Sequence, residues 1–410
     1  MHILFLTDNF PPEVNAPASR TFEHAREWVR AGHQVTVVTG APNFPTGKLL
    51  AGYRNRLRQS EMMDGIRVIR VWTYITANEG FFRRSLDYLS FMVMGGIAAL
   101  FVRKADVVVG TSPQLFTALA AFIVAFVKRR PFVFELRDIW PASIKAVGAL
   151  KDGWLLRRLE ALELFLYRRA KTVIAVTHAF KDELVRRGID GTKIHVVTNG
   201  ADLSRFSSRR KPDELTEKLG LNGKFVAGYV GTHGMAHGLE TLLEAAQILG
   251  NAPGGQDIRI VLLGDGARKT QLRAQADAMN LRNVLFLDTV PKEEVADYWA
   301  LLDVSIIHLK RDPLFKTVIP SKLFECMAMG IPVLHGVEGE SATIVGQSQC
   351  GACFPPEDAK DLAEKLISLS REPTRMAHFR QHALRSAPEY DRTVLARRML
   401  VHMQSVARKS

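Results

Sequence analysis

A lysine and a glutamate lie three residues apart in the segment 320–333, at Lys322 and Glu325. This helical spacing places both side chains on one face of a helix. Pro320 suits a helix start and Gly330 suits a left-handed helix end, so a short helix is predicted. Near the start of this helix, the Lys322 ammonium can neutralise a phosphate, and the Glu325 carboxylate can accept hydrogen bonds from ribose hydroxyls. Both interactions suit a sugar nucleotide. An ordinary amphipathic helix with a solvated polar face is the alternative.

Closely spaced glycines follow two apolar runs, 225–230 and 258–263. Glycine at a strand-to-helix junction lets the backbone approach a diphosphate. The predicted nucleotide-sugar site combines these loops with the lysine helix: Gly231, Gly234, Gly264, Asp265, Gly266, Ser321, Lys322, Leu323 and Glu325. His233 lies in the first loop, where it either contacts the diphosphate or is only a turn residue. Arg268 and Lys269, after the second loop, are interpreted as a solvated helix face.

Apolar strand-like runs alternate with helical stretches along the chain, which is the pattern of doubly wound parallel sheets. A polar, basic stretch at 207–212 is typical of a linker and separates two series of runs. The runs are 3–6, 35–38, 68–71, 107–109, 132–136, 173–176 and 195–197, then 225–230, 258–263, 284–287, 304–307 and 331–334. The predicted fold class is therefore α/β, with two Rossmann-like domains.

Polar residues follow most runs of the first series. Ligands of open α/β sheets lie outside the carboxyl ends of the strands, so these residues are predicted to line a crevice. The candidates are Asn9, Ser112, Arg137, Asp138, His178 and Asn199. Thr39 and Thr177 occupy similar positions, but we interpret them as cap or turn residues.

The apolar segment 86–102 lies between the basic pairs Arg83-Arg84 and Arg103-Lys104. Its 17 residues only reach the lower limit for spanning a bilayer, and they include Asp87. A membrane-docking helix at the interface is the favoured interpretation, with a buried core helix and a true span as alternatives. The predicted docking residues are Phe81, Phe82, Arg83, Arg84, Phe91, Arg103 and Lys104.

The net charge of +13 is concentrated in the first half of the chain: residues 1–205 hold 29 Lys and Arg against 18 Asp and Glu, and residues 206–410 hold 26 against 24. No nucleic-acid motif accompanies the basic residues, so an anionic membrane surface is predicted as a partner and nucleic acid is not. Three cysteines are too few for a disulfide framework, and no metal or other cofactor is predicted. The first residues lack signal-peptide features, which predicts a cytoplasmic protein.

Several motifs together resemble the family-4 retaining glycosyltransferases. The segment 320–333 is similar to the nucleotide-binding signature of that family, and its Pro-Ser-Lys form resembles the bacterial surface-polysaccharide branch, which includes N-acetyl-fucosamine transferases. Further matches are Gly264-Asp265-Gly266, Pro11-Pro12-Glu13, 32–37, 137–141 and 198–202, so the resemblance covers most of the chain. The chain departs from the family at Thr317, where a Glu is usual, and at His233 and His237, where many relatives have an Arg and a Lys.

The resemblance implies a GT-B fold, in which two Rossmann-like domains face a central cleft. Residues 1–205 are the implied acceptor domain, 206–386 the nucleotide-sugar domain, and 387–410 a helix that returns to the first domain. The implied reaction transfers a sugar, such as an N-acetylated hexosamine or deoxyhexosamine, from a UDP-sugar to a polyprenyl-diphosphate-linked acceptor with retention. The implied location is the cytoplasmic face of the inner membrane, to which the protein is peripherally bound. The oligomeric state is not predicted.

The expected catalytic residues are Asp138, His233 and Lys322. In the family, the departing phosphate helps to deprotonate the acceptor, so the main task of Lys322 and His233 is to stabilise leaving-group charge. Asp138 either orients an acceptor hydroxyl or holds its loop by pairing with Arg137. Two other functions stay open: a UDP-sugar 2-epimerase, which shares the fold, and a noncatalytic nucleotide-binding partner subunit.

Overall fold

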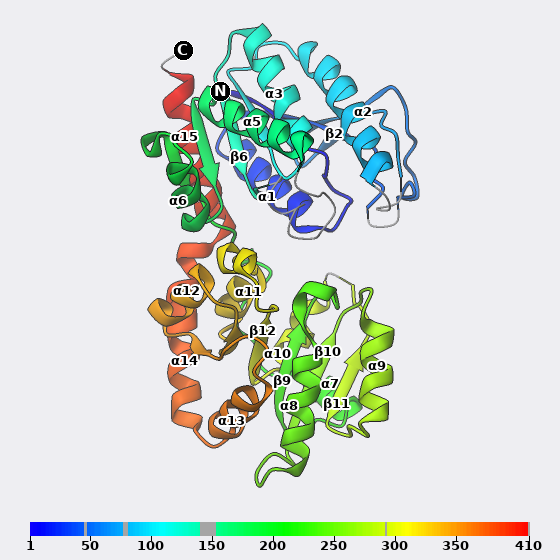
Figure 1. Ribbon diagram of the computed structural model, residues 1–410, viewed down its shortest axis with the longest axis vertical. Coiled ribbons are helices and arrows are strands. Elements are labelled where there is room, and N and C mark those ends of the chain that lie inside the picture. Colours follow the sequence, from blue (N-terminus) through cyan, green and yellow to red (C-terminus); the bar gives the residue numbers. More distant parts are fainter. Residues whose placement is uncertain (45–46, 77–80, 140–152, 292, 409–410) are drawn as a thin grey trace. The chain divides into compact units, whose positions relative to one another are not determined.

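The structure is a computed structural model that describes residues 1–44, 47–76, 81–139, 153–291 and 293–408 (Figure 1). The chain forms two compact units, one of Met1–Thr198 with Arg392–Ser410 and the other of Asn199–Asp391. Each unit is built around one sheet of mainly parallel strands flanked by helices. The predicted α/β class with two parallel-sheet domains is therefore confirmed.

The sheet of the first unit has the strand order β3-β4-β2-β1-β5-β6-β7-β8. The strands are β1 (His2–Leu6), β2 (Gln34–Gly40), β3 (Arg58–Met63), β4 (Ile66–Val71), β5 (Val107–Thr111), β6 (Phe132–Leu136), β7 (Thr172–Ala175) and β8 (Ile194–Val196). The pairing is parallel except at β3, which runs antiparallel to β4 at the sheet edge. Sequence analysis did not predict β3, because its residues are exposed or half-buried and form no apolar run.

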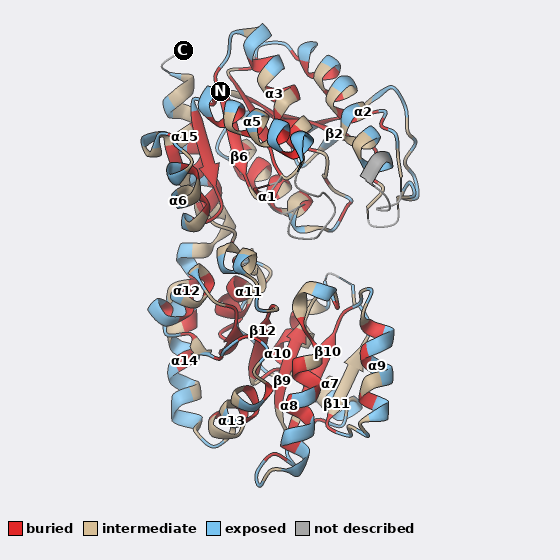
Figure 2. Ribbon diagram, viewed as in Figure 1, coloured by how far each residue is buried: buried red, intermediate tan, exposed pale blue. Residues whose placement is uncertain are grey.

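Helices cover both faces of this sheet because its buried strands present apolar side chains on both sides. The helices are α1 (Ala16–Arg30), α2 (Phe81–Leu100), α3 (Leu115–Lys128), α5 (Trp154–Arg169), α6 (His178–Arg186) and α15 (Arg392–Ala407). Leu4 and Leu6 of β1 pack with α2 and α3, while Ile3 and Phe5 pack with α1 and α15. Figure 2 shows the central strands as buried and the outer sides of the helices as exposed.

The sheet of the second unit has the order β11-β10-β9-β12-β13-β14, and all its pairings are parallel. Its strands are β9 (Phe225–Val230), β10 (Ile258–Leu263), β11 (Val284–Leu287), β12 (Val304–His308), β13 (Val333–Gly336) and β14 (Gly351–Cys353). Its helices are α7 (Asp213–Lys218), α8 (Glu240–Asn251), α9 (Lys269–Ala278), α10 (Val295–Ala300), α11 (Lys322–Met329), α12 (Glu340–Ser348), α13 (Ala359–Ser370) and α14 (Pro373–Ser386). The three-residue strand β14 is too short to leave a sequence pattern.

The compact units divide at Thr198, whereas we expected the boundary after residue 205. The basic stretch 207–212, interpreted as a linker, belongs to the second unit because its cations are paired there. Arg209 Nη1 lies 2.7 Å from Asp297 Oδ1, and Lys211 Nζ lies 2.7 Å from Asp303 Oδ2. The returning helix α15 begins at Arg392, and Trp28 Nε1 of α1 donates to Ala396 O at 2.8 Å.

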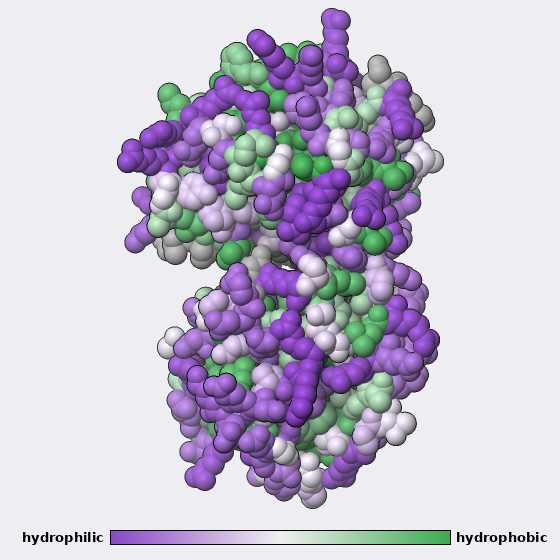
Figure 3. Space-filling model, turned by 180° about the vertical axis from the view of Figure 1, so that it is seen from behind, coloured by the Kyte–Doolittle hydropathy of each residue, from purple (hydrophilic) through white to green (hydrophobic). Residues whose placement is uncertain are grey.

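Helix α2 packs against the core with one side and exposes apolar residues on the other. Phe91 is fully buried, so its predicted role in membrane docking is wrong: it is a core residue. Leu86, Leu89, Val93, Ile97 and Leu100 are 37–50% exposed, and their spacing forms one stripe along the helix. Among the described helices, none is long and apolar enough to cross a membrane. On the rear faces of the two units, apolar side chains lie scattered among polar ones (Figure 3).

The remaining predicted docking cations are exposed. Arg83 and Arg84 lie in the first turn of α2, and Arg103 and Lys104 follow its end. Arg84 Nη2 donates to Tyr88 Oη at 2.8 Å, one turn further along the helix. The side chains of Phe81 and Phe82 lie outside the described part of the structure. The docking role of this helix therefore depends on the exposed stripe and its flanking cations.

Candidate functional site

Helix α11 starts at Lys322 and ends at Gly330, as predicted from the sequence. Gly330 adopts the left-handed conformation with φ of 66°, and its N–H closes the helix. Leu323, Phe324, Cys326 and Met327 are buried in the core, which fixes the orientation of the helix. Ser321, Lys322 and Glu325 are half-buried. The sequence pattern and the core packing thus place the three predicted polar residues together at the half-buried start of one helix.

The ammonium of Lys322 lies over the ring of Tyr229, 3.6 Å from the ring centroid. Among the described residues, Lys322 Nζ has no hydrogen-bond partner. Burial lowers the pKa of Lys322 to about 8, while the nearby Glu325 carboxylate acts to raise it. A buried cation held by a ring face alone retains its capacity to bind an anion.

Gly231 lies directly beside this ammonium, at the end of β9. Its φ is 140°, and a Cβ at this position would come within 3.0 Å of Lys322 Nζ. The predicted glycine loops also contact each other. A Cβ on Gly264 would lie 1.9 Å from Gly231 O, and one on Gly266 would lie 2.5 Å from His233 O. Glycine is therefore required at these positions because two backbones meet there.

The two loops are joined by main-chain hydrogen bonds. His233 N donates to Asp265 O at 2.8 Å, and Arg268 N donates to His233 O at 3.0 Å. The Asp265 carboxylate accepts from Gly266 N at 2.8 Å and is exposed. The structure thus brings Gly231, Gly234, Gly264, Asp265 and Gly266 together at the carboxyl ends of β9 and β10.

His233 and His237 lie around the ring of Tyr229, with centroids 6.0 and 5.9 Å from it. Burial lowers the pKa of each histidine to about 4, and it is assisted by Lys269 at His233 and by Lys322 at His237. Both are therefore neutral at neutral pH. His233 has no exposed surface, so its ring reaches a ligand only if the Gly231–Gly238 loop shifts. Any stabilisation of leaving-group charge by His233 would therefore come from a neutral ring, because desolvation disfavours its protonated form.

Lys269 was wrongly interpreted as part of a solvated helix face. Only 8% of its surface is exposed, and its Nζ donates to Gly264 O at 2.8 Å and to Leu287 O at 3.2 Å. It also lies 2.5 Å from Asp288 Oδ1. The long aliphatic stem lets the ammonium reach back to the strand ends. Arg268 is half-buried and pairs with Glu240. Lys269 therefore braces the second glycine loop, and its place shortly after that loop is a signal that sequence analysis noted but misinterpreted.

In the first unit, the structure brings three predicted residues together. Ser112 Oγ accepts from Arg137 N at 2.8 Å and from Asp138 N at 3.1 Å. Ser112 is buried, so it fixes the loop that presents the other two side chains. Asn9 Oδ1 accepts from Asn15 Nδ2 at 2.7 Å, and Asn15 caps α1.

Two other candidates lie elsewhere. His178 is the exposed first residue of α6, and Asn199 is the first residue of the second unit. Thr177 has the local role that we predicted for it: its Oγ1 caps α6 by accepting from Phe180 N at 3.1 Å. Thr39 is not the cap or turn residue that we predicted, because it lies within β2 and its Oγ1 donates to Asp8 O at 3.1 Å, which joins two distant parts of the chain.

Arg137 lies in a cluster of arginines near the start of α1. Burial lowers its pKa to about 10, the Glu135 charge raises it, and Arg20 and Arg392 lower it further. Arg20 Nε donates to Glu135 Oε1 at 3.0 Å, while Arg137 Nη1 has no partner among the described residues. Glu135 pairs with Arg20 and Glu23 pairs with Arg392, so among the described residues these two carboxylates leave Arg137 without an ion pair of its own. Arg137 is therefore suited to bind an anion.

Sequence analysis missed a group of acidic residues near the end of β1. Burial raises the pKa of Asp8 to about 6, and the negative charge of Glu13 adds to this effect. Burial raises the pKa of Asp87 to about 8, and the negative charge of Asp8 adds to this effect. Asp8 accepts a hydrogen bond from Gln114 Nε2. Glu13 Oε1 accepts from Asn43 N and Phe44 N, each at 2.9 Å. Glu13 belongs to the quoted Pro-Pro-Glu loop, but α2 brings Asp87 to this position only through tertiary packing.

Comparisons with known proteins agree with this architecture. The model of a glycosyl transferase 4-like domain matches residues 15–200, and that of glycosyl transferases group 1 matches residues 212–385. A putative colanic acid biosynthesis glycosyl transferase of Escherichia coli, WcaI, is 25% identical over 378 residues, covering 88% of this chain and 90% of the relative.

Two solved structures show the same fold over the whole chain. Sucrose-phosphate synthase from Thermosynechococcus elongatus has a TM-score of 0.80 at 16% identity and covers 100% of both chains. HepE of Anabaena, solved in complex with UDP, has a TM-score of 0.70 at 17% identity and covers 99% of this chain and 100% of HepE.

Proposed function

The chain belongs to the family-4 glycosyltransferases of the GT-B fold, and from that premise we propose that it transfers a sugar from a UDP-sugar to a polyprenyl-diphosphate-linked acceptor. The observation that carries the proposal is the unpaired ammonium of Lys322 beside the glycine loop of β9. The colanic acid relative supports a role in bacterial surface-polysaccharide synthesis, and the UDP complex of HepE supports a uridine nucleotide.

The donor binds at the second unit. We assign the diphosphate to Lys322 and to the backbone N–H group of Ser321, because unpaired N–H groups at a helix start attract anions. Glu325, on the same helix, accepts hydrogen bonds from the ribose hydroxyls. His237 serves as a neutral hydrogen-bond donor, His233 does so only after the Gly231–Gly238 loop shifts, and Lys269 keeps the Gly264-Asp265-Gly266 loop in place.

The reaction breaks the bond between the anomeric carbon and the diphosphate oxygen and forms a bond from that carbon to the acceptor hydroxyl oxygen. We infer that the hydroxyl proton passes to the departing phosphate on the same face of the sugar, which gives retention. Negative charge then accumulates on the leaving diphosphate. Lys322 stabilises this charge most where water is excluded.

The acceptor binds at the first unit. Arg137 is assigned to the acceptor diphosphate, and Asp138 is assigned to orient the attacking hydroxyl. The apolar stripe of α2 and its flanking cations Arg83, Arg84, Arg103 and Lys104 hold the enzyme on the cytoplasmic face of the inner membrane. This arrangement brings the enzyme to a substrate that cannot leave the bilayer.

The test is product formation by the purified protein with UDP-, GDP- and ADP-sugars and a lipid-diphosphate acceptor in detergent. We expect transfer from a UDP-linked N-acetylated sugar, and its loss in Lys322→Met. UDP binding without transfer to any acceptor would favour the noncatalytic subunit. Conversion of the UDP-sugar to its 2-epimer without an acceptor would identify the isomerase and overturn the proposal.

A further inference from the structure

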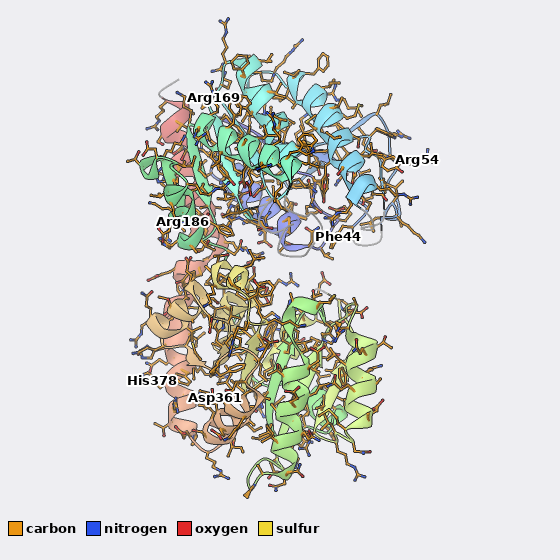
Figure 4. All side chains as sticks on the ribbon, viewed as in Figure 1. Phe44, Arg54, Arg169, Arg186, Asp361 and His378 are labelled. Atoms are coloured by element: carbon orange, nitrogen blue, oxygen red, sulfur yellow. The ribbon has the colours of Figure 1, made fainter. Side chains whose placement is uncertain are left out.

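A cavity of about 520 Å³ lies in the first unit at the amino-terminal ends of β6 and β7. Its walls come from the ends of α3 and α5 and from Pro131 and Phe132 at the start of β6. Arg137 and Asp138 follow the other end of β6, so the cavity and the predicted acceptor residues lie at opposite edges of the sheet. Figure 4 shows Arg169, from the cavity, and Phe44, from the loop after β2, at opposite ends of this unit.

The floor of the cavity is aromatic. The Phe122 ring contacts Phe165 edge-on, with centroids 5.4 Å apart, and lies 5.8 Å from Phe132 and 6.3 Å from Phe126. Phe126 is 74% exposed, although it forms part of the wall. Exposing an aromatic ring in a concave site is costly in water, so this floor fits an apolar ligand group.

The rim of the cavity is cationic. Arg129, Arg130, Arg169 and Lys171 line it and are exposed. In the described parts of the chain, none of the four forms an ion pair, and Arg169 instead lies over the Phe165 ring at 5.4 Å. Residues 107–134 contain no Asp or Glu, so the walls from α3 and β6 offer no local counter-charge. Four unpaired cations around one opening favour an anionic ligand group.

An apolar floor under a cationic rim matches an amphiphile with a phosphate head. We propose that this cavity binds an anionic phospholipid of the membrane, with its headgroup phosphate on the rim cations and the first part of an acyl chain on the aromatic floor. A free phosphate would leave the aromatic floor unused. The site is distinct from the donor and acceptor sites and does not depend on the transfer reaction.

The exposed stripe of α2 ends at the same edge of the sheet. Lys128 Nζ donates to Leu100 O and to Val102 O, each at 2.7 Å, and so joins the ends of α2 and α3. Phe101, after α2, is 71% exposed, as Phe126 of α3 is. A lipid in the cavity would therefore place this edge of the unit against the bilayer, which orients the docked enzyme as well as binding it.

The experiment measures binding of the full chain to vesicles of phosphatidylcholine alone or mixed with phosphatidylglycerol, without donor or acceptor. We expect the double substitution Arg169→Ala with Lys171→Ala to weaken binding to the mixed vesicles roughly 30-fold, since each cation near an anionic membrane contributes about 1 kcal/mol. The control is Arg54→Ala with Arg58→Ala, which removes the same charge from exposed positions on another part of the unit. This control should bind like the unsubstituted protein.

A second measurement tests the floor directly. In Phe126→Trp, bromine-labelled acyl chains of phosphatidylglycerol should quench the fluorescence of the introduced tryptophan, whereas inorganic phosphate should not change that fluorescence. Equal losses in the two double variants would overturn the proposal in favour of diffuse charge attraction. Competition by inorganic phosphate without quenching would overturn it in favour of a free phosphate site. These assays contain no sugar nucleotide. A negative result would therefore overturn the lipid site alone, and the proposed transfer reaction is tested separately by product formation.

Discussion

Lys322 and Tyr229 form a cation–π pair, with the ammonium 3.6 Å from the ring centroid. The lysine comes from the start of α11 and the tyrosine from β9, so the pair joins the two elements that carry the predicted donor residues. A ring face attracts a cation without neutralising it. The ammonium is therefore held in position and still able to bind a phosphate.

Lys322→Met should remove most of the donor affinity. A hydrogen bond to a charged group contributes about 1.5–3 kcal/mol, so UDP affinity should fall about 10- to 150-fold. Calorimetric titration with UDP measures this change. Lys322→Arg keeps the charge and should recover part of the affinity. If Lys322→Met binds UDP like the unsubstituted protein, Lys322 is not a diphosphate ligand.

The affinity for UDP should depend on pH through Lys322. Its pKa is lowered to about 8, so the ammonium is protonated below that pH and loses its proton above it. UDP affinity should therefore be constant near neutral pH and decline as the pH rises through about 8. Titrations between about pH 7 and about pH 9.5 measure the profile. Lys322→Met should have a flat profile over this range, and an unchanged decline in that variant would assign it to another group.

Glu325→Gln should weaken donor binding while the fold survives. Glu325 is half-buried at the outer face of α11, so its loss leaves the core contacts of Leu323 and Phe324 intact. We expect about a tenfold loss of UDP-sugar affinity, or about 1.4 kcal/mol, with an unchanged melting temperature. Glu244→Gln, an exposed position on α8, is the matched control. Unchanged donor affinity and turnover in Glu325→Gln would contradict the ribose assignment.

Asp87→Asn should stabilise the protein, and increasingly so as the pH rises. The folded pKa of Asp87 is raised from 3.8 to about 8, so the folded state holds a proton that the unfolded state has lost between these values. Stability from this group is therefore highest at low pH and falls towards pH 8. Because Asp87 is only half-buried, we expect a gain of about 1–2 kcal/mol at about pH 8. Urea unfolding at about pH 5 and about pH 8 tests it, with exposed Asp182→Asn as the control.

A pair of substitutions on α2 separates its core role from its docking role. Phe91→Ala removes a fully buried ring and should cost about 3–5 kcal/mol of unfolding free energy. Val93 is 50% exposed on the apolar stripe, so Val93→Ser should change stability little but weaken vesicle binding. Urea unfolding and vesicle flotation of both variants provide the comparison. Undiminished flotation of Val93→Ser would show that the stripe does not contact the membrane.

The sequence by itself determined the strands, the two sheets and the helix from Lys322 to Gly330. These features depend on local patterns, because apolar runs, glycine turns and helix caps act over a few neighbouring residues. The strands β3 and β14 were not predicted, because β3 has no apolar run and β14 has only three residues. The close approach of Gly231 and Gly264 agrees with the glycine pattern, although the pattern does not say which group approaches the backbone.

Only the tertiary structure decided the environment of each polar side chain. The position of Lys322 over Tyr229, the brace from Lys269 to two strand ends and the proximity of Asp87 to Asp8 all join residues far apart in the chain. Burial and neighbouring charges set the pKa values of Lys322, Asp8 and Asp87, and neither is a property of local sequence. Phe91 shows the same limit, because an apolar helix presents one side to the core and another to solvent, and packing alone decides which residues face inward.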